Sequence, residues 1–317
     1  MKKINVPNFK VSEVCDFVIS HSSEKEDKRI KNLFTRKNPI QWKEEIVFYE
    51  TLYYEKRNQL YNMEEMREIH GIRITQMENV YDYSMSSRHN FRAKLYSLVP
   101  ERCPICDKKW GFDDKNLDHI LPKSLFPQLA ITPYNLVPTC SICNDRKNDD
   151  YGKDVSTGVF NPYFHRISLP KYMNCYIYVS SGMIEVNVYL KPFDECEIQD
   201  ENRYKRLKYW FEKLYNLDQL YRVNIGINIS KIIDGFARSD TQEDTISEDF
   251  LRRDFQENYN KYREYNFSDG IVSDEFLIFI MYNSLANKST KELLTLIKET
   301  IISRKAELTS AKTEDEF

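Results

Sequence analysis

The sequence predicts an α+β protein that is mostly α-helical, with a small cysteine-rich module between two helical regions and a β-hairpin after the module. Three observations support this fold class. Charged stretches such as residues 42–66 carry apolar residues every three or four positions, as amphipathic helices do. Two Cys-x-x-Cys pairs are separated by 33 residues. Residues 175–190 alternate between apolar and polar side chains, as half-buried strands do.

The N-terminal region, residues 1–97, is expected to form a helical domain. Its clearest helical pattern runs from Trp42 to Met66, where Glu and Lys are dense and apolar residues recur at helical spacing. A second, short helix is predicted from Phe91 to Leu98. This helix would deliver the chain to the first cysteine pair.

The cysteine pairs predict a structural zinc site. Each pair places two thiolates on one tight turn, so two pairs complete the tetrahedral shell of a closed site. The predicted ligands are Cys103, Cys106, Cys140 and Cys143. Ordinary buried cysteines and redox-active pairs are the alternatives, and two pairs together favour zinc over both. The remaining cysteines are expected to be core residues; they are Cys15, Cys175 and Cys196.

Four polar residues in or beside the segment between the pairs have side chains suited to phosphodiester hydrolysis, which needs a base and a cation. His119 titrates near neutral pH, and Asp118 faces the other side of an extended strand, where it can hold a hard divalent ion. Asn144 can supply a second oxygen ligand, and Asn135 can orient the histidine. Each residue alone has an ordinary explanation as a surface, core or turn residue. Their joint placement favours a catalytic site.

Residues 103–150 closely resemble the HNH endonuclease family, whose fold is a β-hairpin followed by a helix, with the metal ion between them. The resemblance implies that His119 is the general base and that Asp118 and Asn144 hold a catalytic Mg²⁺ or Mn²⁺. The four cysteines match the members of the family that carry structural Zn²⁺.

Further roles are implied by the same resemblance. Asn135 would position the catalytic histidine, and Lys147 falls where related enzymes carry a basic residue, which suggests a phosphate contact. The family often has histidine where this chain has Asn144. An amide oxygen is a harder ligand than imidazole, so this difference favours Mg²⁺ or Mn²⁺ over Ni²⁺ or Zn²⁺ in the catalytic position.

The nuclease-like module is predicted to span residues 98–168. Its last part contains the aromatic segment Phe160–Phe164, which we expect to pack in the core of the module. His165 is interpreted as a bystander rather than a ligand.

The C-terminal region, residues 169–317, is expected to contain a β-hairpin and more helices. The hairpin turns at Ser181-Gly182. Apolar residues at helical spacing between Arg203 and Lys213 predict an amphipathic helix, and base stacking by its aromatic residues is the less favoured explanation. A capping box at Ser289–Glu292 predicts the start of a later helix.

The charge and apolar composition limit which partners the protein is expected to bind. The net charge of −3 does not favour a protein that grips long DNA by a basic face alone. Six basic residues without an intervening acid form a candidate contact for phosphates or a partner protein: Lys28, Arg29, Lys31, Arg36, Lys37 and Lys43. A solvated helix face explains them equally well. No apolar run approaches 18 residues and no secretory signal is present, so we expect a cytoplasmic protein without membrane contact.

The resemblance therefore implies a metal-dependent endonuclease that cuts DNA and leaves 5′-phosphate and 3′-hydroxyl ends. HNH modules in similar helical contexts resemble effectors of bacterial defence or restriction-type systems, which suggests a regulatory partner such as an ATPase or a sensor. A non-catalytic zinc module that binds nucleic acid or protein is the alternative from another class. RNA remains open as a substrate.

Overall fold

The computed structural model describes residues 3–22, 27–99, 101–110, 114–239, 242–265, 267 and 272–314. The chain forms two compact units, each built from two segments. Unit 1 contains Met1–Ile167 and Ile198–Asn216, and unit 2 contains Ser168–Glu197 and Leu217–Phe317. The predicted mostly helical α+β class is confirmed. The predicted division into three domains at residues 97 and 168 stays a prediction.

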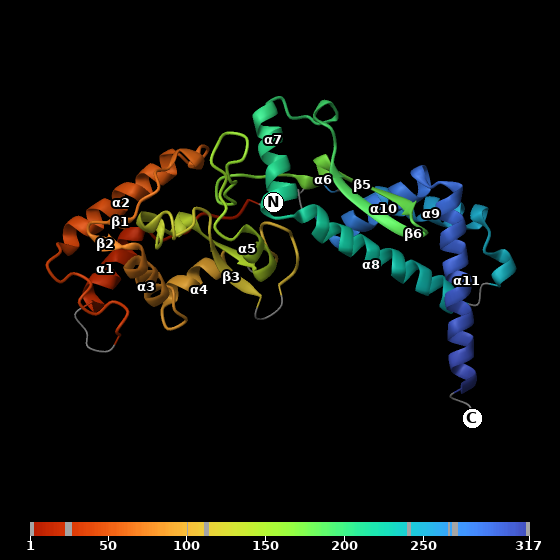
Figure 1. The fold of residues 1–317 in the computed structure, drawn as a ribbon, viewed down its shortest axis with the longest axis horizontal. Coiled ribbons are helices and arrows are strands. Elements are labelled where there is room, and N and C mark those ends of the chain that lie inside the picture. Colours follow the sequence, from red (N-terminus) through yellow and green to blue (C-terminus); the bar gives the residue numbers. More distant parts are fainter. Residues whose placement is uncertain are drawn as a thin grey trace. The chain divides into compact units, whose positions relative to one another are not determined.

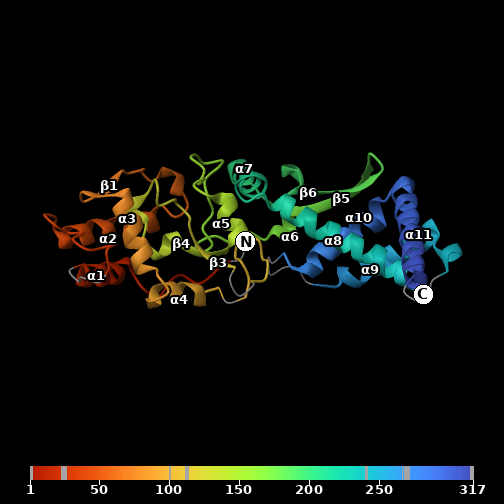
Figure 2. The ribbon, with the colours of Figure 1, turned by 60° about the horizontal axis from the view of Figure 1, so that its bottom comes forward.

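Unit 1 joins an N-terminal group of helices to a ββα module (Figure 1). Its helices and strands are α1 (Val11–His21), α2 (Pro39–Glu55), β1 (Glu68–Ile69), β2 (Ile72–Arg73), α3 (Ile74–Ser84), α4 (Asn90–Ser97), β3 (Lys115–His119), β4 (Leu136–Cys140), α5 (Ser141–Lys147) and α7 (Glu201–Tyr209), which continues as a π-helical turn at Trp210–Leu214. Helices α1, α2 and α3 lie together on one side of the module in both ribbon views (Figures 1 and 2). One apolar core joins them to Leu117 and Leu136 of the module.

The predicted helix from Trp42 to Met66 is too long. Helix α2 ends at Glu55, because the next four residues, Lys-Arg-Asn-Gln, offer no apolar side chain to the core. Beyond it the chain forms a single 3₁₀ turn and then the small β1–β2 hairpin, which the sequence analysis did not anticipate. This hairpin turns at His70 and Gly71, both of which have positive φ. Helix α4 lies within one residue of its predicted position.

Unit 2 contains the predicted β-hairpin and four long helices. Its elements are α6 (Leu169–Tyr172), β5 (Met173–Ser180), β6 (Met183–Leu190), α8 (Leu217–Arg238), α9 (Glu248–Arg263), α10 (Asp274–Lys288) and α11 (Lys291–Glu314). The β5–β6 hairpin turns at Ser181 and Gly182, as predicted, and lies along α8 and α10 (Figure 1). One face of the hairpin is buried, with Ile177 and Val186 paired on it.

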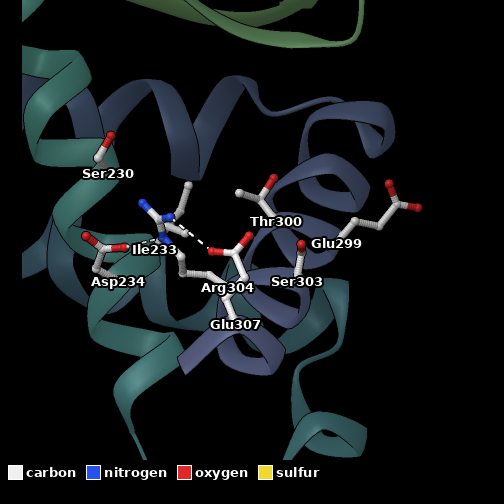
Figure 3. A pocket seen from close by; sticks show the side chains of 8 residues that line it. All are labelled: Ser230, Ile233, Asp234, Glu299, Thr300, Ser303, Arg304 and Glu307. Carbon is white, nitrogen blue, oxygen red and sulfur yellow. Dashed lines mark hydrogen bonds and ion pairs between the residues drawn. The ribbon is translucent and has the colours of Figure 1, made fainter. Parts of the chain in front are cut away.

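Helix α11 of unit 2 begins one residue later than the capping-box pattern predicts. The Oγ1 atom of Thr290 accepts the Leu293 N–H, whereas the Ser289 hydroxyl bonds backward to the Leu285 carbonyl. A groove between α8 and α11 is lined mostly by polar side chains, with Arg304 bridging Asp234 and Glu307 (Figure 3). Within the described residues, no helix has both the length and the apolar character to cross a bilayer.

Candidate active site and metal centre

The ββα module forms from a short antiparallel pair and the helix that follows it. Strands β3 and β4 pair so that His119 lies opposite Leu136 and Asp118 opposite Val137. Helix α5 starts directly after Cys140, the last residue of β4. This arrangement is the hairpin and helix that the sequence resemblance implies, and it places the catalytic candidates of β3 beside α5.

The four cysteines predicted as zinc ligands come together within the module. All are buried, and their Sγ atoms lie within 4.8 Å of one another. The Sγ atoms of Cys106 and Cys140 are 3.7 Å apart, close to the edge of roughly 3.8 Å that four Zn–S bonds of about 2.3 Å give in a tetrahedron. The Cys140 N–H also donates to Sγ of Cys103. The donor set and spacing fit structural Zn²⁺.

Asp118 is buried with an unusual set of neighbours. Its Oδ1 lies 3.2 Å from Nζ of Lys147, while its Oδ2 is buried without a hydrogen bond of normal geometry in the described structure, with the hydroxyl of the buried Tyr215 as a polar neighbour of the carboxyl. Burial raises the pKa of this carboxyl to about 6, against the opposing effect of the Lys147 ammonium. A buried carboxylate oxygen without a partner is costly, and a divalent cation would satisfy it. Asp118 therefore fits the predicted role of metal ligand.

His119 is held in one orientation by the loop between the two strands. Its Nε2 lies 2.9 Å from the Ala130 carbonyl oxygen. A carbonyl can only accept, so Nε2 carries the proton and Nδ1 keeps its lone pair. Burial lowers the pKa of the ring to about 3, below the near-neutral value expected from the sequence, so the ring is neutral at neutral pH. This is the tautomer that a general base requires.

Asn135 fixes the same loop, and its contacts differ from the predicted hydrogen bond to the histidine. It is fully buried; its Oδ1 accepts the Leu121 N–H, and its Nδ2 donates to the carbonyls of Leu121 and Leu129. Leu129 directly precedes Ala130, whose carbonyl holds His119. The described hydrogen bonds of the Asn135 side chain are therefore to the loop backbone and not to the His119 ring.

Asn144 and Lys147 lie one turn apart on α5 in different environments. Asn144 is half-buried and lines the same cavity of about 280 Å³ as Asp118 and His119, so the structure brings together both candidate ligands and the candidate base. Lys147 is buried, and its ammonium also donates to the carbonyls of His119 and Asn148. This geometry does not favour the phosphate contact predicted for Lys147, because the ammonium faces protein oxygens rather than solvent. That contact stays a prediction.

Two residues outside the predicted set help to build the cavity. Tyr81 of α3 packs its ring against His119, with centroids 4.6 Å apart, and Nζ of Lys123 lies 4.7 Å from the centre of the Tyr81 ring. Both line the cavity. No motif marked Tyr81, because its approach depends on the packing of α3 against the module. Lys123 directly follows Leu121-Pro122 of the His119 motif, so the sequence indicated a positive charge near the histidine but not a place in the cavity wall.

The candidate basic patch of the N-terminal region is partly neutralised. Arg29 pairs with Asp27 and donates to the Asp82 carbonyl, and Lys43 pairs with Asp16. Two of the six positive charges are therefore compensated locally, which weakens the patch as a contact for phosphates. Its role in binding stays a prediction.

The fold and the site define a ββα module with a four-cysteine metal centre and a histidine-containing cavity. Residues 103–150 match the family model described as HNH endonuclease, which confirms the resemblance drawn from the sequence. The chain is also similar to Protein ea31 of Escherichia phage lambda, with 25% identity over 222 residues that cover 67% of this chain and 71% of that protein. No solved structure matches the chain. The family match supports a nuclease that depends on metal and acts on nucleic acid.

Proposed function

We propose that this protein is a metal-dependent endonuclease that hydrolyses phosphodiester bonds in DNA. The observation that carries the proposal is the shared cavity in which the neutral His119 ring, the Asp118 carboxyl and the Asn144 amide meet. A binding module would need the cysteines but has no use for these three groups. The zinc centre would hold the hairpin and helix in register.

His119 would accept a proton from the attacking water at Nδ1. The water oxygen forms the new bond to phosphorus as the bond to the 3′ oxygen breaks in line with it, and the leaving oxygen takes a proton from solvent. The products are a 5′-phosphate and a 3′-hydroxyl. The Ala130 carbonyl stabilises the positive charge that develops on the ring, because it accepts the Nε2–H bond.

Asp118 and Asn144 would hold the catalytic divalent ion. When bound, Mg²⁺ or Mn²⁺ supplies positive charge against the negative charge that builds on the leaving oxygen. The unpartnered Oδ2 of Asp118 fits such an ion, and two protein ligands leave room for the waters that Mg²⁺ keeps. Oxygen donors match these hard ions better than Zn²⁺.

The remaining parts of the chain suggest control by a partner. The net charge is −3 and part of the basic patch is neutralised, so tight DNA binding by this chain alone is not expected. We propose that the protein acts as the effector of a bacterial defence or restriction-type system, in the cytoplasm, beside a regulatory protein such as an ATPase or a sensor.

The test is cleavage of supercoiled plasmid by the purified protein with Mg²⁺ or Mn²⁺, beside an RNA of matched length. His119→Ala and Asn144→Ala should abolish cleavage, while His70→Ala, a histidine of unit 1 that does not line the cavity, should cut normally. Cleavage that survives His119→Ala would refute the mechanism. Cleavage of RNA alone would assign the same site to a ribonuclease. An inactive protein that still fails after its genomic neighbours are added would favour the binding module.

A further inference from the structure

Unit 1 has a second cavity that shares no lining residue with the candidate active site. Its volume is about 380 Å³, within the range of pockets that bind small molecules. Three segments of unit 1 form it: residues 58–61, residues 155–166 and the first turns of α7. The cavity is therefore assembled from segments that are far apart in the sequence.

A buried guanidinium forms one side of this cavity. Arg206 of α7 is only 8% exposed and donates to the backbone carbonyls of Asn58, Gly158 and Val159. No carboxylate pairs with it in the described part of the chain. Neutral carbonyls position a guanidinium without cancelling its charge, so Arg206 keeps a positive potential in a place of low dielectric.

Other charges at the cavity reinforce this potential. Arg203, one turn earlier on α7, is exposed, and its side chain makes no hydrogen bond or ion pair with any described residue. Asp200 is the one acidic residue among the described lining residues, and its Oδ1 is engaged as the cap of α7 through the N–H groups of Asn202 and Arg203. Burial first, and then the nearby Arg206, lowers the pKa of His165 to about 4. The cavity is thus a positive site with little acidic compensation.

Aromatic rings supply the remaining wall. The Arg206 guanidinium carbon lies 4.1 Å from the centre of the Phe160 ring, and the side chains of Phe164 and Tyr61 also line the space. Tyr61 packs so closely on Gly158 that a Cβ atom at position 158 would lie 2.6 Å from its ring. Flat apolar surfaces beside positive charge that no described carboxylate neutralises suit a ligand that has both a planar ring and an anionic group.

We propose that this cavity binds a nucleoside phosphate, with the phosphate on Arg203 within the positive potential of Arg206 and the base against Phe164 and Tyr61. The ligand is either the terminal nucleotide of a DNA strand or a free nucleotide. A strand end bound here would give the nuclease a second contact with its substrate. A free nucleotide would make the cavity a ligand sensor of the nuclease unit.

Arg203 is the residue to change, because it is exposed and supports no other contact. In the absence of added Mg²⁺, calorimetry on the full-length Asn144→Ala protein should show binding of AMP, with adenosine and inorganic phosphate each at least about tenfold weaker. Arg203→Gln should weaken AMP binding about tenfold, the loss of one charge-assisted hydrogen bond. Lys205→Gln is the matched control: it removes one positive charge from the same helix, outside the cavity, and should leave AMP binding unchanged.

Two short oligothymidines, one with a 5′-phosphate and one with a 5′-hydroxyl, distinguish a strand end from a free nucleotide as the ligand. Preference for the phosphorylated strand over both AMP and the hydroxyl strand, lost in Arg203→Gln, assigns a strand end; equal affinity for AMP and the strand assigns a free nucleotide. The proposal is overturned if neither AMP nor the phosphorylated strand binds at about 1 mM, or if Arg203→Gln leaves binding unchanged. The Asn144→Ala background keeps this result independent of catalysis.

Discussion

Asn135 gives the sharpest test of how the loop of the module supports catalysis. Its side chain makes three hydrogen bonds, of 2.8 Å from the Leu121 N–H, 2.9 Å to the Leu121 carbonyl and 3.2 Å to the Leu129 carbonyl. Asn135→Ala removes all three and leaves buried backbone groups unsatisfied. At about 1 kcal/mol for each neutral hydrogen bond, we expect unit 1 to lose roughly 3 kcal/mol of its free energy of unfolding.

The same change should reduce cleavage even where the protein stays folded. The Ala130 carbonyl, next to Leu129, fixes the His119 ring and its tautomer. A loop that shifts by about 1 Å is expected to cost about a hundredfold in rate, because the base then misses the attacking water. Asn144→Ala is the contrasting control: its side chain makes no hydrogen bond that stabilises the described structure, so activity should fall without loss of stability.

Urea unfolding followed by tryptophan fluorescence measures the stability of unit 1, which contains Asn135. All three tryptophans, at positions 42, 110 and 210, belong to unit 1, so the signal reports that unit and not unit 2. Initial rates of plasmid cleavage are measured below the unfolding transition. An Asn135→Ala protein that matches the wild type in urea midpoint, or that loses stability but cleaves at the normal rate, would refute the role assigned to this side chain.

Four further outcomes are expected. His119→Ala should lower the rate of cleavage by roughly two to four orders of magnitude while the protein stays folded with its zinc content unchanged. Loss of the buried ring and its hydrogen bond to the Ala130 carbonyl should lower the urea midpoint; loss of zinc would instead assign a structural role. Cys140→Ser should lose zinc, measured by atomic absorption, and unfold the module, whereas a stable, zinc-free and active variant would contradict the structural centre. Lys147→Met should leave Asp118 buried without its ion pair and lower the free energy of unfolding by about 3 kcal/mol in metal-free buffer. Mg²⁺ should restore more stability to this variant than to the wild type, and equal gains would argue against Asp118 as a ligand. Burial lowers the pKa of His165 from 6.5 to about 4, so the folded state favours its neutral form. The free energy of unfolding should therefore fall as the pH drops from 6.5 towards 4, by at most on the order of 3 kcal/mol. In urea titrations at several pH values His165→Gln should flatten this dependence, and an unchanged slope would contradict the assignment.

Local chemistry explains what the sequence predicted well. The four cysteines converge because two tight turns and one ion-sized space fix their positions, and the β5–β6 hairpin forms where Ser181 and Gly182 supply the positive φ values of the turn. Asp118 and His119 at the end of β3 line one cavity with Asn144 of α5, because β3 pairs with β4 and α5 starts where β4 ends. Each of these inferences needs only neighbours in sequence or a known module geometry.

Long-range packing explains what the sequence did not predict. Asn135 bonds to Leu121 and Leu129 rather than to the histidine, because the path of the loop decides which backbone groups come within reach. The end of α2 at Glu55 also depends on where the core stops, since charged residues continue on both sides of that point. Lys147 shows the same limit: its position in the motif suggested a phosphate, while its burial reveals the Asp118 carboxyl as its partner.

The nuclease-like module is not separable from the helices around it. Tyr81, from α3, forms a wall of the cavity against His119, and the core of the N-terminal helices includes Leu117 of β3. On the other side, Arg146 of α5 donates to the carbonyl of Tyr215, more than sixty residues further along the chain. Orientation of the base therefore depends on segments that the HNH match does not cover. A change in how these segments pack would alter the cavity without touching a motif residue, which would give the proposed regulatory partner a physical route to the site.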